Sequence, residues 1–417
     1  MGTINTNYLK VYLGMIWNEF ALGNAIHIKH GYAFKGEFFS DKGDYIVLTP
    51  GNFFEEGGFR IRPDKERYYT SDFPKAFILE KGSLIIAMTE QGPGLLGSSA
   101  LIPSENRYLH NQRLGLVDHI DTNLLDKLFL YFLFNSSLVR NQINGSASGT
   151  KVRHTAPERI YRVMVRAPDV KTQAKIAEIL LSYDHLIKTN QRRIQLLEES
   201  ARLLYREWFV NLRFPGHETV PIKDGVPEGW RKANLFEVCD VTYGYPFKAN
   251  LFNCEGIGTQ IIRIRDIPEM KSNTYTIEEI DESYLVRRGD LLIGMDGIFH
   301  MNNWAGKTGY LVQRVCKFRP KVEILLAFVS LALIEPIKYY ESTIQGATVA
   351  HLGTKHLKEI NLLIPRGLDV CLKYLNDLLW QRIYLHEMNM QLAQSRDLLL
   401  PKLMSGALDV SQIRSIA

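Results

Sequence analysis

Cysteine is scarce: the chain has only four cysteines among 417 residues, and none lies in the first 238. The four are Cys239, Cys254, Cys316 and Cys371, and no two have the Cys-x-x-Cys spacing of a zinc or redox site. Because half the chain lacks cysteine, a disulfide framework cannot hold the protein together. The isolated pair His27 and His30 favours a solvated strand over a metal site. We therefore expect no metal centre and a reducing, cytoplasmic environment.

Long hydrophobic runs and low-complexity tracts are also missing. The longest apolar stretch, 324–334, is interrupted by Ser330 and falls well short of the ~20 residues that a membrane-spanning helix needs. Hydrophobic residues make up 46% of the chain, and 50 Lys+Arg face 45 Asp+Glu, a net charge of +5. This balance predicts folded domains without a membrane partner, and the length suggests two to four of them.

The sequence motifs that identify common enzyme classes are incomplete or missing in this chain. The segment 92–97 fits Gly-x-Gly-x-x-Gly, but 98–103 is poor helix material, so the dinucleotide-binding context is missing. Gly306-Lys307-Thr308 resembles the end of a phosphate-binding loop, yet Met301 stands where its first glycine belongs. The chain has no Gly-x-Ser-x-Gly elbow and no Pro-Pro. We therefore expect no catalytic residues.

The sequence contains an internal repeat of about half its length. Residues 31–35, Gly-Tyr-Ala-Phe-Lys, recur at 244–248 as Gly-Tyr-Pro-Phe-Lys, an offset of 213. Further matching segments follow in the same order at falling offsets: 81–88 with 288–295, Gln112-Arg113 with Gln313-Arg314, and 150–168 with 347–365. Several landmarks in one order are hard to obtain by chance, so the pattern indicates a tandem duplication.

Each copy has the same internal plan. Alternating or apolar runs such as 44–49 and 260–265 predict short strands. A short apolar helix is predicted near 124–135 in the first copy and near 325–334 in the second. The plan predicts two mixed α/β domains.

A long helix is predicted from 174 to about 210, because this segment contains no Gly or Pro and its apolar residues repeat at coiled-coil spacing. The seam consists of Leu180, Tyr183, Ile187, Asn190, Ile194, Leu197, Ala201, Leu204 and Trp208. A second seam consists of Leu375, Leu378, Arg382, Leu385, Asn389, Leu392, Arg396, Leu399 and Leu403, with the two arginines as departures and with Pro401 and Gly406 ending the helix. Two such rods, each roughly 50 Å long, would hold two domains at a fixed separation.

Asn190 and Asn389 occupy corresponding positions in the two seams, at an offset of 199. A polar residue in a coiled-coil seam costs stability but fixes register and partner. The alternative interpretation is a tolerated asparagine that faces solvent.

The distribution of charge indicates nucleic-acid binding. Residues 151–166 contain five Lys or Arg and one His but a single acid. The counterpart in the second copy contains His351, Lys355, His356 and Lys358. Loops that follow strand ends carry side chains able to pair with base edges, and these loops differ between copies although the flanking strands agree. Two domains with one scaffold and different loops would read two different short sequences, although each residue alone could be a solvated loop group.

Further motifs complete the pattern. They are Gly-Asp-Leu-Leu-Ile-Gly-Met-Asp-Gly at 289–297, Gln-Ala-Lys-Ile-Ala-Glu-Ile-Leu at 173–180, Arg-Glu-Trp-Phe-Val at 206–210 and Leu-Pro-Lys-Leu-Met-Ser-Gly at 400–406. Together with the duplication, they resemble the specificity (S) subunits of type I restriction–modification systems over essentially the whole chain. The sequence departs from that pattern at 370–374, where Val-Cys-Leu-Lys-Tyr stands in place of the Gln-Ala-Lys-Ile-Ala block. We therefore expect one of the two methyltransferase copies that the family binds to dock differently in detail.

The resemblance implies an α+β fold: a tandem duplication of two mixed α/β target-recognition domains, joined by two long helices that form an antiparallel coiled coil with pseudo-twofold symmetry. The expected boundaries are 1–168 for the first domain, 169–214 for the central helix, 215–365 for the second domain and 366–417 for the distal helix. No role is assigned to the irregular N-terminal segment, 1–14.

The resemblance also implies the function. Each target-recognition domain reads one half of a split, asymmetric site in double-stranded DNA. The paired helices set the spacing and dock two methyltransferase (M) subunits, and restriction (R) subunits join through that core complex. Adenine methylation with S-adenosylmethionine and ATP- and Mg-dependent restriction would then take place on partner subunits, so this chain is expected to bind no cofactor and to be no enzyme by itself.

The resemblance also indicates candidate functional residues. DNA contacts are expected from Tyr32, Lys35, Thr89, Glu90, Gln91, Lys151, Arg153 and His154 in the first domain, and from Tyr245, Lys248, Asp296, His300, Asn302, Asn303, Lys307 and His351 in the second. Phe34 and Phe247 of the Gly-Tyr-x-Phe-Lys motifs are expected in the core. Helix pairing and partner docking are expected from Leu180, Tyr183, Ile187, Asn190, Ile194, Leu197, Leu204, Trp208, Leu378, Leu385, Asn389, Leu392 and Leu399.

Two alternatives remain open at the level of sequence. A coiled-coil scaffold that joins two proteins without touching DNA would show no salt-dependent DNA binding in its assembled complex. A standalone DNA-binding regulator would bind tightly without a methyltransferase, but its long apolar seams demand a partner.

Overall fold

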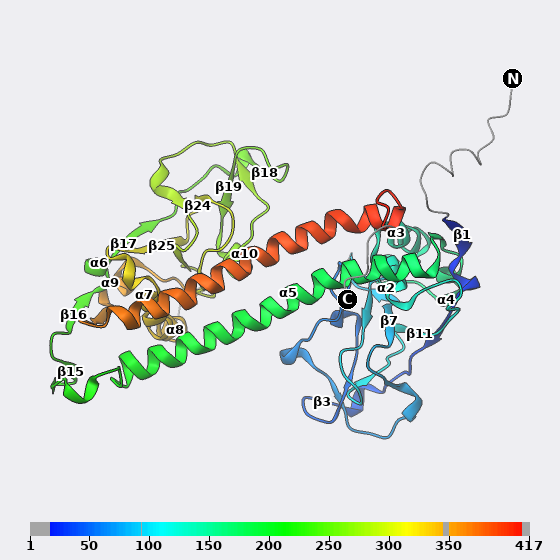
Figure 1. Ribbon diagram of the computed structural model, residues 1–417, viewed down its shortest axis with the longest axis horizontal. Helices are drawn as coiled ribbons and strands as arrows, with labels where there is room; N and C mark the ends of the chain where they lie inside the picture. The colour runs from blue at the N-terminus through cyan, green and yellow to red at the C-terminus, as the bar shows by residue number, and fades with distance from the viewer. Residues whose placement is uncertain (1–16, 93, 345–349, 411–417) are drawn as a thin grey trace. The chain divides into compact units, whose positions relative to one another are not determined.

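The computed structural model describes residues 17–92, 94–344 and 350–410 (Figure 1). The chain forms two compact units: unit 1 comprises 1–185 and 393–417, and unit 2 comprises 186–392. Each unit therefore contains one of the predicted domains together with part of both long helices. The lead at 1–14 lies outside the described residues.

Unit 1 is built on two sheets. A four-stranded antiparallel sheet has the order β2 (Ile26–His30), β11 (Leu114–Ile120), β7 (Leu84–Ala87) and β9 (Ser99–Leu101). A five-stranded sheet has the order β3 (Phe39–Ser40), β5 (Tyr68–Tyr69), β4 (Tyr45–Val47), β10 (Tyr108–Leu109) and β6 (Ile78–Leu79). Two further strand pairs are β1 (Asn18–Ala21) with β13 (Met164–Ala167) and β8 (Thr89–Glu90) with β12 (Arg153–His154).

Unit 2 repeats the strand order of both sheets. Its four-stranded sheet has the order β17 (Cys239–Tyr243), β25 (Val315–Pro320), β22 (Leu291–Gly294) and β23 (Met301–Asn303). Its five-stranded sheet has the order β18 (Phe252–Asn253), β20 (Tyr275–Thr276), β19 (Thr259–Ile262), β24 (Gly309–Leu311) and β21 (Leu285–Val286). The pair β16 (Arg231–Asn234) with β26 (Asn361–Ile364) matches β1 with β13, and the hairpin of β14 (Ile222–Lys223) and β15 (Val226–Pro227) is additional. The predicted duplication is confirmed in the fold.

Short helices cover the sheets. Unit 1 contains α2 (Lys127–Asn135), α3 (Ser137–Ser146) and α4 (Pro157–Tyr161); unit 2 contains α6 (Leu235–Val238), α7 (Leu326–Ala332), α8 (Ile334–Thr343) and α9 (Thr354–Glu359). The Asp126 carboxylate caps α2 by accepting hydrogen bonds from the backbone N–H groups of Leu128 and Phe129. Six consecutive residues of α2, 129–134, are buried, as expected of a helix that is apolar on all sides.

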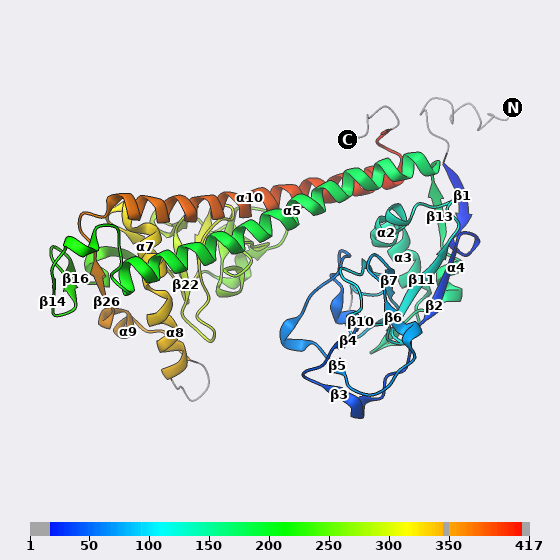
Figure 2. The same ribbon diagram turned by 60° about the horizontal axis from the view of Figure 1, so that its bottom comes forward.

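Both long helices lie within the predicted segments, 169–214 and 366–417. Helix α5 (Val170–Tyr205) follows β13 almost directly (Figure 2), and a π-helical turn continues it to Val210. Helix α10 (Asp369–Ser405) passes through Pro401 and ends before Gly406, which has a positive φ of 76°. The expectation that Pro401 helps to end this helix is wrong, because Leu403 and Met404 are buried in the core of unit 1 and hold the last turn in place.

The two helices pair antiparallel within each unit. In unit 1, Arg396 of α10 forms an ion pair with Asp184 of α5 at 2.6 Å. In unit 2, Asn190 lies opposite Asn389, and Glu198 lies opposite Arg382 at 3.1 Å. Residue numbers rise along α5 as those of the contacted residues fall along α10. The expected antiparallel coiled coil is confirmed.

Candidate nucleic-acid interface

The Gly-Tyr-x-Phe-Lys motif and the Gln-Arg segment form one structural feature in each unit. Tyr32 donates its backbone N–H to the His110 carbonyl at 2.8 Å and accepts from the Gln112 N–H at 3.0 Å. A Cβ atom on Gly31 would lie 2.0 Å from the Asn111 carbonyl oxygen, so only glycine allows this approach. The two landmarks of the repeat are therefore parts of one backbone contact.

Unit 2 builds the same contact. Tyr245 donates its N–H to the Leu311 carbonyl and accepts from the Gln313 N–H, both at 2.9 Å. A Cβ atom on Gly244 would lie 2.0 Å from the Val312 carbonyl oxygen. The repeated motif thus serves the same purpose in both copies.

The aromatic residues of the motif are partly structural. Phe247 is buried, and Phe34 is half-buried with its ring edge-on to Tyr69, in keeping with the prediction that both belong to the core. Tyr32 and Tyr245 are half-buried. Lys35 and Lys248 are exposed. Of the motif, the lysines are most open to a ligand and the tyrosines less so.

One end of each four-stranded sheet gathers many of the predicted residues. In unit 1, β7 ends at Ala87 opposite Leu114, and β2 ends at His30 opposite Gly115, so the loops beyond these positions emerge together. His154 pairs with Thr89 across the β12–β8 ladder at the same end. The residues brought together here are Tyr32, Lys35, Thr89, Gln91 and His154, and Lys151 lies exposed three residues before His154.

Unit 2 gathers its residues at the corresponding end, where Gly294 lies opposite Val315 and Tyr243 opposite Cys316. Asp296 and His351 form an isolated antiparallel bridge, as Thr89 and His154 do within their ladder. The residues brought together are Tyr245, Lys248, Asp296 and His351, and half-buried His300 lies in the loop between β22 and β23. Part of the segment that precedes His351, 345–349, lies outside the described residues.

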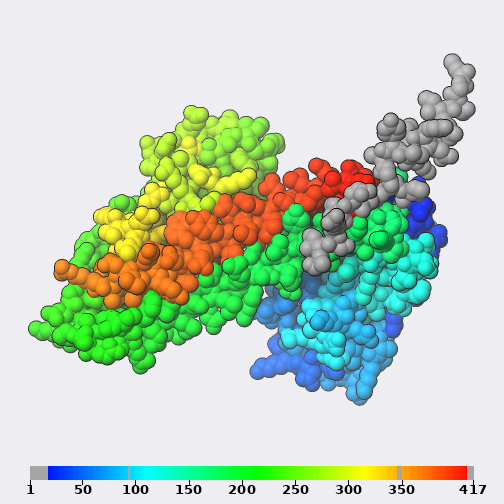
Figure 3. Space-filling model, in the orientation of Figure 1, coloured from blue at the N-terminus to red at the C-terminus, as the bar shows by residue number. Residues whose placement is uncertain are grey.

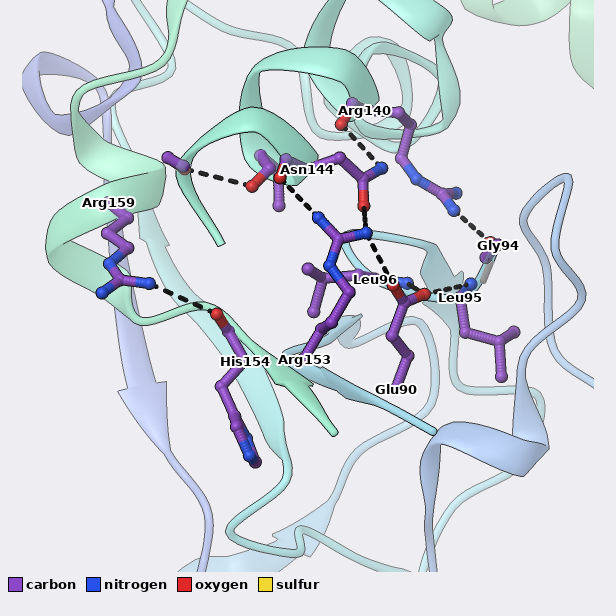
Figure 4. Close-up of polar contacts among 11 residues, drawn as sticks. Glu90, Gly94, Leu95, Leu96, Arg140, Asn144, Arg153, His154 and Arg159 are labelled. Carbon is purple, nitrogen blue, oxygen red and sulfur yellow. Dashed lines mark hydrogen bonds and ion pairs between the residues drawn. The ribbon is translucent and has the colours of Figure 1, made fainter. Parts of the chain in front are cut away.

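Glu90 is buried in unit 1 and pairs with Arg153, whose side chain is about one-third exposed (Figure 4). The Glu90 carboxylate is buried, accepts hydrogen bonds from the backbone N–H groups of Leu95 and Leu96 at 2.9 and 2.8 Å, and pairs with Arg153 at 3.1 Å. Arg153 also donates to the Asn144 side chain at 3.1 Å. This network holds the loop at 94–97 in place. The Glu90 carboxylate occupies the backbone N–H groups of Leu95 and Leu96, which a bound phosphate would otherwise use. His154 points away from it in Figure 4.

The predicted residues on β23 do not reach the loop cluster. Asn303 is buried and donates to the Gly289 carbonyl and to the Ser330 hydroxyl, both at 3.0 Å. Asn302 is half-buried. Lys307 is exposed, but its carbonyl accepts from the Trp304 indole at the opposite end of β22. The sequence suggested a loop here, whereas register with β22 turns Asn303 inward. Glu90 and Asn303 are therefore not carried further as base-contacting residues.

The helix seam lies as its spacing indicated. Among its members Leu180, Asn190, Ile194, Leu378 and Leu385 are buried, and Tyr183, Ile187, Leu197, Leu204, Trp208, Asn389, Leu392 and Leu399 are half-buried. The two arginines that depart from the apolar pattern each have a carboxylate on the facing helix, Asp184 for Arg396 and Glu198 for Arg382. Pairing offsets part of the cost of burying each charge, although Arg382 has two buried nitrogens, Nε and Nη2, without a hydrogen-bond partner among the described residues.

Other chemistry has little support in the described part of the chain. No cluster of three or more His, Cys, Asp or Glu residues suited to a metal ion occurs among the residues that the structure describes. All four cysteines are free, and burial raises the pKa of the Cys316 thiol, which disfavours the reactive thiolate. Within the same residues, no helix has both the length and the apolar content to cross a membrane.

Two copies of one mixed α/β domain, with long helices paired antiparallel and polar loops gathered at one end of each sheet, define a duplicated two-domain recognition protein. The sequence matches the family model of the type I restriction modification DNA specificity domain over residues 16–199 and 227–367. These segments cover most of the chain, and the chain belongs to this family.

Several characterised proteins are similar to this chain. The EcoBI specificity subunit of Escherichia coli is 31% identical over 141 residues, which are 34% of this chain and 30% of that protein. The MjaVIII specificity subunit of Methanocaldococcus jannaschii is 25% identical over 40% of this chain and 41% of its own length. The chain thus spans less than half the length of these two relatives. The MjaIX specificity subunit of the same archaeon is 21% identical over 81% of this chain and 80% of its own.

A solved structure shares the fold. The S subunit of a type I restriction–modification system from M. genitalium superposes with a TM-score of 0.61, at 16% identity, over 94% of this chain and 96% of that one. The likeness extends over both units and both long helices, which supports the fold described above.

Proposed function

We propose that this chain is the sequence-reading subunit of a type I restriction–modification complex, in which each unit reads one half of a split, asymmetric DNA site. The observation that carries the proposal is the pair of equivalent loop clusters at equivalent sheet ends. The scaffold is the same in both, but Thr89 and Gln91 of unit 1 correspond to Asp296 and Ile298 of unit 2. Different side chains on one scaffold suit two different half-sites.

The charges at these ends suit the DNA backbone. Lys35 and Lys151 are exposed in unit 1, and Lys248 is exposed in unit 2. Lysine neutralises phosphate and fixes the register of a protein on the duplex, while neutral and acidic polar groups discriminate between bases. Membership of a DNA specificity family makes double-stranded DNA the ligand that best fits this combination.

The paired helices provide the spacer and the docking surface for partners. In the space-filling view (Figure 3), outer faces of α5 and α10 in unit 2 are open to solvent, and they carry the exposed apolar residues Leu196, Leu203, Tyr374, Tyr384 and Met388. Leu196 and Leu203 lie seven residues apart and therefore on the same face of α5, where exposed apolar side chains suit a protein–protein interface. We assign them to methyltransferase subunits, through which restriction subunits would join.

In this arrangement the chain itself performs no chemistry. Methyl transfer from S-adenosylmethionine to adenine, and restriction driven by ATP with Mg²⁺, belong to the partner subunits. The complex would act on DNA in the cytoplasm. This chain contributes the choice of site and the distance between its halves.

Salt-dependent DNA binding tests the proposal. In the complex with a methyltransferase subunit, Lys35→Ala and Lys248→Ala should each weaken DNA binding and lower the slope of log K against log salt by about 0.9 per lost phosphate contact. Lys127→Ala and Lys223→Ala, at exposed lysines away from the loop clusters, are matched controls and should leave the slope unchanged. A complex that does not bind DNA in a salt-dependent way would be a scaffold. Tight, specific binding without any methyltransferase would instead indicate a standalone regulator.

A further inference from the structure

An arginine and a histidine occupy the same position in both units, beside the variable loop. In each unit a methionine at the end of the central strand donates its N–H to the arginine carbonyl and accepts from the residue after the histidine. The bonds are Met88 to Arg113 at 3.0 Å and Thr155 to Met88 at 2.9 Å in unit 1, and Met295 to Arg314 and Leu352 to Met295, both at 2.8 Å, in unit 2. The repeat therefore preserves a backbone cradle that presents Arg113 with His154, and Arg314 with His351.

In unit 2 a carboxylate joins these two side chains. The Asp296 Oδ1 atom lies 2.6 Å from His351 Nδ1, and its Oδ2 atom lies 3.4 Å from Arg314 Nε. Arg314 and His351 remain exposed, and Asp296 is about one-third exposed. The carboxylate thus forms an ion pair with the guanidinium on its Nε side. Among the residues that the structure describes, neither terminal nitrogen of Arg314 donates a hydrogen bond to the protein.

The backbone at Arg314 is strained. Its φ of +72° lies in the left-handed region that non-glycine residues rarely adopt. Such conformations persist where surrounding contacts impose them, and they gather at ligand-binding positions. Here the Gln313 N–H is fixed by the Tyr245 carbonyl, and the Arg314 carbonyl by Met295. These backbone hydrogen bonds, before and at Arg314, therefore fix the conformation of the turn that carries its side chain.

Unit 1 has the same cradle without the carboxylate. Thr89 stands at the position of Asp296, and within the described residues the Arg113 guanidinium has no carboxylate in ion-pair range. Arg113 is exposed. The two units thus present an arginine at the same position, paired with a carboxylate in unit 2 and unpaired in the described part of unit 1.

We propose that Arg314, held by Asp296, is a specificity-determining residue that reads a guanine in the half-site of unit 2, whereas Arg113 contacts the DNA backbone of the other half-site. The inference rests on the proposed function. Two free terminal nitrogens match O6 and N7 of guanine in the major groove, which is the commonest specific contact of arginine. Fixing the side chain before binding lowers the entropy lost on forming that contact. Asp296 is a positioning residue in this scheme.

Selection of DNA sequences by the assembled complex with a methyltransferase subunit tests the inference. Arg314→Lys keeps the charge but removes the two-pronged donor, so preference for one G·C pair in one half-site should fall by roughly 5- to 150-fold while overall binding persists. Asp296→Asn should weaken preference at the same base pair. Arg113→Lys is the matched control and should alter no base preference, and Arg113→Gln should lower the salt slope by about 0.9.

Each outcome separates the inference from the proposed function. A wild-type complex without sequence preference overturns the proposed function itself. A selective wild type whose Arg314→Lys variant keeps every base preference overturns only the reading role of Arg314. If Arg314→Lys does not fold, as judged by its thermal unfolding, Asp296→Asn decides, because a braced reader must lose preference at one base pair when its carboxylate is removed. Unchanged preference in that variant contradicts the inference.

Discussion

Asn190 of α5 donates its side-chain amide to the Asn389 carbonyl oxygen at 3.0 Å, joining the two repeats at corresponding positions of their long helices. Asn389 in turn donates to the Ile187 backbone carbonyl at 3.3 Å. The two asparagines of the seam can pair in only one register, because a slip of one helix along the other separates the two amides. The pair therefore specifies how α5 and α10 align.

The first prediction concerns this pair. Asn190→Ala should lower the free energy of unfolding by about 1–2 kcal/mol, because it leaves the buried end of Asn389 without its partner. Replacing both residues by leucine should raise the free energy of unfolding but relax the register. Urea unfolding measures the first effect, and the range of half-site spacings selected by the complex measures the second. Unchanged stability in Asn190→Ala, together with one fixed spacing in the double variant, would rule out a register role.

The second prediction concerns the turn glycine of the repeated motif. Gly31→Ala places a methyl group 2.0 Å from the Asn111 backbone oxygen, and backbone on both sides prevents an easy shift. The free energy of unfolding should fall by at least ~2 kcal/mol. Gly36→Ala, five residues later, meets nothing within 4 Å and should change stability by less than about 0.5 kcal/mol. Equal urea midpoints for the two variants would contradict the close approach.

The third prediction is a pH dependence. Burial lowers the pKa of His110 to about 4, while its Nε2 atom lies 2.9 Å from the Leu114 carbonyl oxygen. The unfolded chain takes up this proton near pH 6.5, before the folded chain does. Stability should therefore be level above pH 6.5 and fall as the pH drops from 6.5 to 4, by up to roughly 3 kcal/mol for this residue.

His110→Gln should remove much of that slope in unfolding measurements made across this pH range. Burial also lowers the pKa of His386 to about 4, so part of the slope should remain. A variant as sensitive to acid as the wild type would show that His110 does not titrate in this way.

The sequence predicted features that depend on local spacing or on the repeat. The duplication predicted that the two copies share one fold, and the seam of α5 follows from apolar residues three and four apart. The glycine of the motif could be recognised as a turn residue, although its backbone contact with Asn111 could not. These features need little knowledge of which distant segments meet.

Contacts between residues far apart in the chain could not be predicted from the sequence. Glu90 and Arg153 are 63 residues apart, and nothing local shows that the carboxylate turns inward to brace its own loop. Asn303 was interpreted as a residue of the loop that follows the strand ending near 295, but pairing with β22 buries it. Arg113 and Arg314 were visible as landmarks of the repeat, and only the Asp296 contact distinguishes them. Arg382 and Arg396 looked like seam defects until their carboxylates on α5 were located.

The central claim is that two equivalent units read two different half-sites at a fixed distance. Its most direct test is to co-express the chain with the methyltransferase subunit of its own genome and to map the modified adenines. The account predicts one split, asymmetric motif with a constant gap, and a change in only one half after the loop exchange Thr89→Asp with Gln91→Ile, which places the residues of unit 2 at these positions and keeps the buried Glu90. A stable complex that produces no sequence-specific methylation, or a loop exchange that alters both halves together, would contradict it.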